Sequence, residues 1–225
     1  MRALLLAALL GVLTLTVHLL VGGHGHAEVP TTGAPVVVAA GSSEAPGGTQ
    51  LENPVITIID VNTYEVTGRT AAEVLASLQA RGPRSGERIF FGLTETEMAF
   101  RYWKTPADGE CRLERIRIDL RVVVTIPEWR APGEAPYRLK RDWSRFETAL
   151  RRHEDQHREI AEVGAREVYR ALHALRTPSC TTIDATAREV ANRLREANEQ
   201  RQAAFDRRTG HGRTQGAVWP QSTLG

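Results

Sequence analysis

The chain has 225 residues, which is enough for one domain of ordinary size with appendages. Its formal net charge of +2 is too small to indicate a nucleic-acid-binding protein, and its arginines are scattered among acidic residues, as on solvated helix faces. It also lacks a glycine-rich phosphate-binding loop and a dinucleotide-binding fingerprint, so we expect no nucleic-acid partner.

The N-terminal segment predicts export. Arg2 precedes an apolar run over residues 3–21, and small residues up to Ala27 suit cleavage by a signal peptidase. The run is also close to the length that spans a bilayer, so an uncleaved anchor in the inner membrane is the alternative. We therefore expect residues 1–27 to be a signal peptide or membrane anchor, and the protein to be periplasmic or secreted.

The next segment predicts a flexible linker. Residues 28–53 are rich in Pro, Gly, Ser, Thr and Ala and show no sustained period. A single folded domain is expected over residues 54–220, followed by a tail over residues 221–225.

The N-terminal half of this domain has the patterns of strands and one short helix. The helix is expected over 71–80, where Thr70 as N-cap and Glu73 three residues later match a capping box. The clearest strand alternates apolar and charged residues, and Pro127 is expected to end it. The expected strands are 55–60, 62–67, 88–92, 97–104 and 116–126.

Two long helices are expected in the C-terminal half, over 142–176 and 184–207. The first has a stripe of residues at steps of three and four that predicts its buried face. The stripe comprises Trp143, Phe146, Leu150, His153, His157, Ile160, Gly164, Val168, Leu172 and Leu175. The predicted fold class is therefore α+β, with an antiparallel β-sheet packed against two long helices.

The first long helix contains His153-Glu154-x-x-His157, a pattern typical of zinc hydrolases. Histidines four residues apart lie on the same side of a helix and can bind one zinc ion. Glu154, beside them, can accept a proton from a zinc-bound water. The alternative is a buried histidine pair, satisfied by hydrogen bonds, that only stabilises the fold.

A hydrolytic zinc site usually has three protein ligands and one water. The common extension of the motif needs glycine and histidine at the positions of Ile160 and Val163, so this chain does not have it. We favour His211 as the third ligand, because the glycines on both sides of it let the backbone approach a buried site. Asp206 is expected to be its hydrogen-bonding partner or the alternative ligand.

Other residues are weaker candidates for the site. Glu189 and Glu196 on the next helix are possible ligands, whereas His173 is too far along its own helix to reach back. Arg213 or Tyr169 could stabilise an oxyanion, and the sequence does not choose between them.

The two cysteines, Cys111 and Cys180, predict one disulfide, because an even pair in an exported chain is usually bonded. The bond would close a loop of about 70 residues and stabilise the fold by roughly 4 kcal/mol. It would connect the segment before the long strand with the segment after the histidine helix. The alternatives are two free thiols or a thiolate nucleophile.

Several motifs resemble those of a known family. They are Tyr64-x-Val66-x-Gly68-x-Thr70, Gly82-Pro83, Trp143-x-x-Phe146, His153-Glu154-x-x-His157, Cys180 and Asp206-x-x-Thr209-x-His211-Gly212. Over residues 54–220 the chain resembles a bacterial family of uncharacterised domains described as predicted secreted zinc-dependent proteases. The resemblance implies export and a zinc peptidase fold. A tyrosine commonly precedes the aspartate in that family, and Phe205 stands there in this chain.

The residues and the resemblance predict the same activity, that of an exported zinc metallopeptidase with one zinc per chain and a peptide or protein substrate. His153, His157 and His211 are expected to hold the zinc. Glu154 would act first as general base and then as general acid. The alternatives are a zinc amidase acting on cell-wall material and a non-catalytic envelope module with a structural metal.

Overall fold

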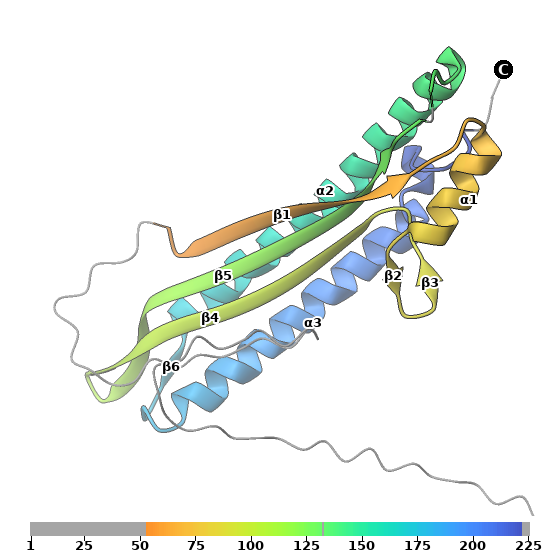
Figure 1. Ribbon diagram of the computed structural model, residues 1–225. Helices are drawn as coiled ribbons and strands as arrows, with labels where there is room; N and C mark the ends of the chain where they lie inside the picture. Colours follow the sequence, from red (N-terminus) through yellow and green to blue (C-terminus); the bar gives the residue numbers. More distant parts are fainter. Residues whose placement is uncertain (1–52, 132, 222–225) are drawn as a thin grey trace, which may run out of the picture. The chain divides into compact units, whose positions relative to one another are not determined.

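The computed structural model describes residues 53–131 and 133–221 (Figure 1). The expected signal peptide or anchor, nearly all of the expected linker and the end of the tail lie outside these residues. Within the described part of the chain, the helices are too polar or too short to cross a membrane.

The main sheet is built around one long central strand. This is β5 (Glu110–Trp129), which pairs in parallel with β1 (Val55–Val66) and antiparallel with β4 (Leu93–Ala107). The short β6 (Arg176–Thr177) pairs with the beginning of β5. The α+β class is confirmed, but the sheet is mixed rather than purely antiparallel. The parallel pair joins strands far apart in the sequence, and local patterns do not encode such pairing.

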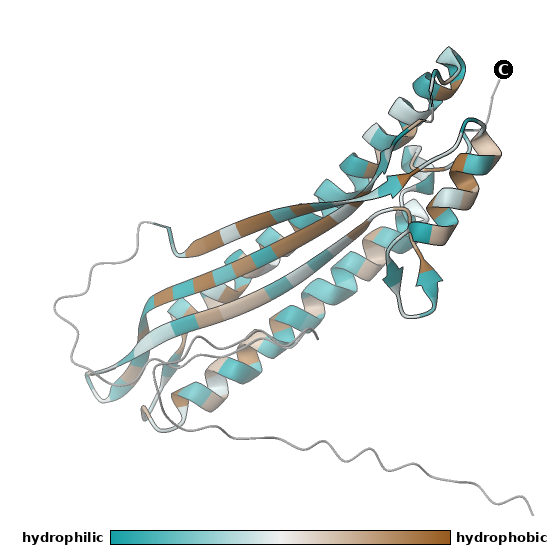
Figure 2. Ribbon diagram, in the orientation of Figure 1, coloured by the Kyte–Doolittle hydropathy of each residue, from teal (hydrophilic) through white to brown (hydrophobic). Residues whose placement is uncertain are grey.

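The alternation in β5 buries one face of the strand as predicted (Figure 2). The alternation shifts phase once, at Arg115, which has a φ of 47°. This residue lies across from the register shift between Arg101 and Trp103 in β4. This bulge lets Leu113 and Ile116, three residues apart, both point into the core. Pro127 does not end the strand as expected, because β5 continues beside β1 to Trp129.

A helix and a small hairpin connect β1 to β4. The helix α1 (Ala71–Arg81) begins at the predicted N-cap, where the backbone NH of Glu73 donates to Thr70 Oγ1 at 3.2 Å. The second half of the capping box differs from the prediction, because Glu73 Oε2 accepts from the backbone NH of Arg69 at 2.7 Å and not from that of Thr70. The hairpin consists of β2 (Arg84–Ser85) and β3 (Arg88–Ile89), which pair with each other. Of the strand expected over 88–92, only Arg88 and Ile89 are in a strand, and they pair within this hairpin.

Two long helices lie along one face of the sheet (Figure 1). They are α2 (Tyr137–Ala174) and α3 (Ile183–Thr209), and the 3₁₀-helix η1 (Arg213–Gln215) follows α3. The helices approach closely at Gly164, where an added Cβ would lie 2.6 Å from Asn198 Oδ1. Most of the predicted apolar stripe lies on the buried face of α2, which begins earlier than expected. His157 and Ile160 are half-buried, and Leu175 lies just after the helix.

The buried residues form two clusters along α2. One contains the part of α2 up to Leu150, together with α1 and Trp219. The other contains α2 from Ala161 onward, the beginning of α3 and much of β5. The two histidines of the motif lie on α2 between these clusters.

The predicted disulfide is present between Cys111 and Cys180, with Cα atoms 5.1 Å apart. It joins the beginning of β5 to the segment between β6 and α3. The sheet and the pair of helices are therefore connected covalently at the end of β5 that is distant from the histidines.

Candidate metal centre

His153, His157 and Asp206 meet at one point between α2 and α3. His157 Nε2 lies 3.0 Å from Asp206 Oδ1, and His153 Nε2 lies 3.3 Å from both of these atoms. Zinc with ligand bonds of about 2.0–2.1 Å in tetrahedral geometry requires its ligand atoms to be about 3.4 Å apart. The three atoms therefore have nearly the spacing of one triangular face of a zinc site, and they are the described group able to hold a metal ion.

Two glutamines hold the imidazoles in this orientation. Gln215 Oε1 accepts from His153 Nδ1 at 2.9 Å, and Gln202 Oε1 accepts from His157 Nδ1 at 2.6 Å. The amide nitrogens have their own acceptors, the backbone oxygen of His157 for Gln202 and Oε1 of Gln156 for Gln215. Each Nδ1 thus carries a proton that it donates to a glutamine, and each Nε2 faces Asp206.

Phe205 positions both rings from the α3 side. Its ring stacks on His153 and meets His157 edge-on, with centroid distances of 4.9 Å in both cases. The side chain is buried. At the position where a tyrosine is common in the resembled family, this chain therefore has an apolar platform for the two imidazoles.

The end of α3 brings a tight loop against the centre. Gly210 ends the helix in the left-handed region, and the backbone NH of His211 donates to Asp206 O. Gly212, with φ 79°, lies so close that an added Cβ would be 3.0 Å from His153 Cγ. The expectation that a glycine here permits close approach is confirmed at Gly212.

His211 lies beside the triangle rather than in it. Its Nδ1 is 3.4 Å from Asp206 Oδ1, and its side chain is 44% exposed. Asp206, which the sequence offered as partner or alternative ligand, is the residue grouped with His153 and His157.

The protonation of the centre depends on its internal contacts. Burial raises the pKa of Asp206, but hydrogen bonds from His153 and His157 outweigh it and hold this pKa far below its usual value. Burial lowers the pKa of His157, but the bonds to Asp206 and Gln202 outweigh that and raise it. The carboxylate is therefore anionic, as a metal ligand must be.

Glu154 is buried, next to the two histidines. Its Oε2 accepts a hydrogen bond from Thr94 Oγ1 at 2.8 Å, and its Oε1 lies against Gly92. Burial raises the pKa of Glu154, and the bond from Thr94 and the nearby histidines offset only part of this effect. A carboxylate with a raised pKa is a stronger base than an ordinary one, which suits it to accept a proton and then release it.

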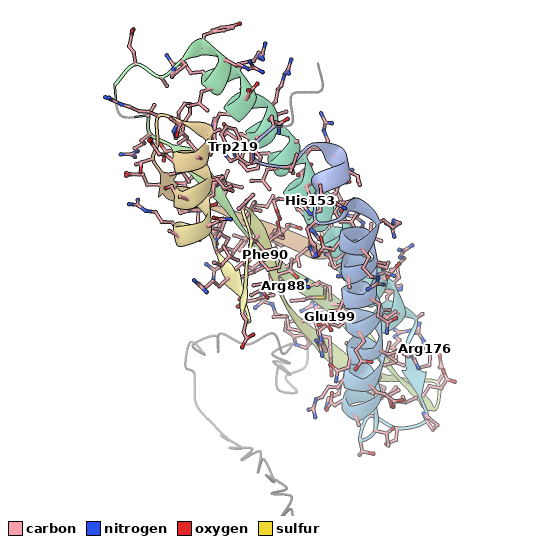
Figure 3. All side chains as sticks on the ribbon, turned by 90° about the vertical axis from the view of Figure 1, so that its right-hand side faces the viewer. Arg88, Phe90, His153, Arg176, Glu199 and Trp219 are labelled. Carbon is pink, nitrogen blue, oxygen red and sulfur yellow. A yellow bond between two sulfur atoms is a disulfide. The ribbon has the colours of Figure 1, made fainter. Side chains whose placement is uncertain are left out.

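A cavity of about 720 Å³ opens over this centre. Glu154, the three grouped residues and His211 all line it. Its apolar wall includes Ile89, Phe90, Phe91, Leu93, Leu150 and Val218. In Figure 3 Phe90 and Arg88 lie between the β2–β3 hairpin and α3, on the same side of the molecule as His153.

The weaker sequence candidates fall outside this cavity, with one exception. Glu189, Glu196 and His173 are exposed and do not line it, and Tyr169 contacts His173 instead. Arg213 does line it.

Sequence reasoning did not find the residues that orient the centre. Gln202 stands four residues before Asp206 on α3, so helical spacing could have placed both on one face. Gln215 and Thr94 lie in a 3₁₀-helix and a strand distant from the motif, and no local signal connects them with it.

The comparisons with known proteins place the chain in a family. The model described as "Bacterial protein of unknown function (DUF922)" matches residues 61–212, which include every residue of the triangle. The chain belongs to this family. No curated protein and no solved structure matches it. The DUF922 match agrees with a resemblance to an uncharacterised bacterial family, and the family's description assigns no activity to the centre.

Proposed function

We propose that the protein is an exported zinc-dependent hydrolase that cleaves peptide bonds, with one zinc held by His153, His157 and Asp206. The observation that carries the proposal is the triangle of ligand atoms 3.0–3.3 Å apart beside a buried glutamate in an open cavity. Two imidazoles and a carboxylate are a donor set that zinc favours, with a fourth position left for water or substrate.

Each residue of the site has a separate role in the proposed hydrolysis. When bound, zinc acidifies water and polarises a carbonyl group. Glu154 accepts a proton from the attacking water and then donates it to the leaving amine. Thr94 holds Glu154 in place, and the two glutamines orient the histidines. The cavity wall supplies apolar contacts for substrate side chains.

Export is supported by two features. The disulfide between Cys111 and Cys180 is of a kind that persists in oxidising compartments such as the periplasm. The apolar run over residues 3–21 has the composition of a signal or anchor.

Metal content tests the centre directly. Elemental analysis of the purified protein should find about one zinc per chain, and the Asp206→Asn variant should lose most of it. The His211→Ala variant should keep its zinc, because His211 stands outside the triangle. Loss of zinc from His211→Ala but not from Asp206→Asn would make His211 the third ligand instead. Absence of zinc after reconstitution of the wild type would contradict a metal centre.

The Glu154→Gln variant separates catalysis from a structural role of the metal. It should retain zinc but cleave peptides at least about 100-fold more slowly, because the general base is lost. If the wild-type protein binds zinc yet cleaves neither peptides nor amide bonds of cell-wall fragments, the metal only stabilises the fold.

A further inference from the structure

The cavity over the centre is lined by two arginines that form no ion pair with its acidic residues. Two of its described lining residues are acidic, Glu154 and Asp206, and both are engaged, by Thr94 and by the histidines. Arg88 and Arg213 line the same cavity. Within the described chain, neither of these guanidinium groups has an ion pair or a hydrogen bond.

Two arginines of α2 beside the site are paired instead. Arg151 pairs with Glu147, and Arg158 pairs with Asp155 and Glu162. These two have intramolecular acceptors within one turn of the helix. Arg88 and Arg213 line the cavity and have no such acceptor among the described residues.

The two arginines come from segments that meet at the cavity. Arg213 stands in η1, and its Nε would be 3.5 Å from a Cβ added at Gly210, so it lies against the turn that ends α3. Arg88 is in β3, two residues before Phe90, whose ring meets that of His211 edge-on with centroids 5.5 Å apart. Figure 3 shows Arg88 and Phe90 in the space between the hairpin and α3.

We propose that Arg88 and Arg213 bind a carboxylate of the substrate. A guanidinium group donates two parallel hydrogen bonds to a carboxylate and is the side chain best suited to this recognition. The adjacent apolar wall binds a hydrophobic side chain of the same ligand. The preferred substrates are therefore peptides with an acidic side chain, or a free C-terminal carboxylate, close to an apolar residue. That these peptides are also cleaved rests on the proposed function, whereas their binding does not.

Peptide binding to an inactive protein tests this proposal. The probes are fluorescently labelled hexapeptides with a central phenylalanine–leucine bond. In one series each peptide carries glutamate or glutamine at one of the other positions. In a second series the peptide ends in a free carboxylate or in an amide. Their binding to full-length Glu154→Gln protein, with and without added zinc, is measured by fluorescence anisotropy. We expect glutamate to bind about tenfold more tightly than glutamine at one or more positions. A difference confined to the C-terminal pair would identify the terminal carboxylate as the ligand.

Arginine variants in the same background assign the contact. Arg88→Gln and Arg213→Gln should each bring the glutamate-to-glutamine ratio of affinities close to one. Arg84→Gln and Arg208→Gln remove the same charge from β2 and α3 at positions that do not line the cavity, and they should leave the ratio unchanged. A ratio near one in the parent protein, or a ratio unaffected in the double variant of Arg88 and Arg213, would overturn the proposal.

The two proposals fail separately. Binding that favours glutamate without any cleavage by the wild-type protein would leave the carboxylate site intact and contradict the peptidase. Cleavage of all peptides at similar rates, with no preference in binding, would support the peptidase and contradict the carboxylate site. If Arg213 instead stabilises the oxyanion, Arg213→Gln will lower kcat for every peptide equally and will not change the affinity ratio.

Discussion

The imidazoles of His153 and His157 are held by amide groups at the nitrogen that faces away from Asp206. An amide oxygen accepts a hydrogen bond from Nδ1–H but is too weak a base to take the proton, so each ring directs Nε2 at the centre. Gln202 contributes twice, because it also donates to the backbone oxygen of His157 on α2. This residue therefore connects the orientation of the ring to the packing of α2 on α3.

Removing this amide should weaken metal binding without removing a ligand. We expect Gln202→Leu to reduce zinc affinity by about 10- to 100-fold, as is usual for partners of ligand histidines. Titration against a competing chelator measures the affinity. Gln200→Leu, an exposed position on the same helix, is the control and should not change it. Equal affinities for the two variants would show that Gln202 does not support the ring.

At the scale of elements, the centre depends on how α3 ends. The helix stops at Gly210, and the chain turns through His211 and Gly212, all with positive φ, so that the loop lies against His153. Thr209 fixes the turn, since its hydroxyl accepts from the backbone NH of Gly212 at 3.2 Å. The spacing Asp206-x-x-Thr209-x-His211-Gly212 thus encodes a helix terminus with a loop folded back onto α2.

Two glycines of this loop give a matched comparison. Gly212 and Gly216 both have positive φ, so alanine at either should cost roughly 1–2 kcal/mol of backbone strain. At Gly212 the added Cβ would also press on His153 Cγ at 3.0 Å, whereas at Gly216 its contact, with Ala149 Cβ at 3.5 Å, is ordinary. Both variants should unfold at lower urea concentration, but only Gly212→Ala should also lose zinc affinity. Equal zinc affinities would mean that the loop gives way without moving the ring.

The sequence could predict what depends on local periodicity. The buried face of α2, the N-cap at Thr70 and the alternation of β5 are all set by neighbours within a few residues, and the structure has them. The cysteine pair was predictable from the expectation of export, because two cysteines in an exported chain are usually bonded. The parallel pairing of β1 with β5 and the approach of Gln215 to His153 depend on tertiary contacts, which no local pattern contains.

The choice between Asp206 and His211 shows the same limit. The sequence predicts that both residues lie near the histidine pair. Which of the two is closer to His153 and His157 depends on where α3 ends. An aspartate on the last turn of the helix faces α2 directly, whereas His211 follows the cap and is displaced by the turn.

At the scale of the whole molecule, a partly buried polar contact far from the centre joins the sheet to α3. Asp184, in the first turn of α3, accepts from Tyr102 Oη at 2.9 Å and from Lys104 Nζ at 2.8 Å, both in β4. Burial raises the pKa of Asp184, but these hydrogen bonds outweigh burial and the pKa is lowered. The carboxylate also lies at the positive end of the helix dipole.

This contact makes stability depend on pH with a definite sign. Because the pKa of Asp184 is lower in the folded than in the unfolded chain, its contribution is fully present above the unfolded value of about 3.9 and is lost as the pH falls through the folded value. Asp184→Asn should therefore lower the free energy of unfolding by about 1–2 kcal/mol at pH 7 and by less near pH 3. Urea unfolding of both proteins at the two pH values measures this difference.

Asp60→Asn, which breaks the exposed pair with Arg121, is the control and should change stability little at either pH. A loss from Asp184→Asn that is the same at both pH values would mean that the contact stabilises through shape and neutral hydrogen bonding, and that the charge on Asp184 does not help to hold α3 on the sheet.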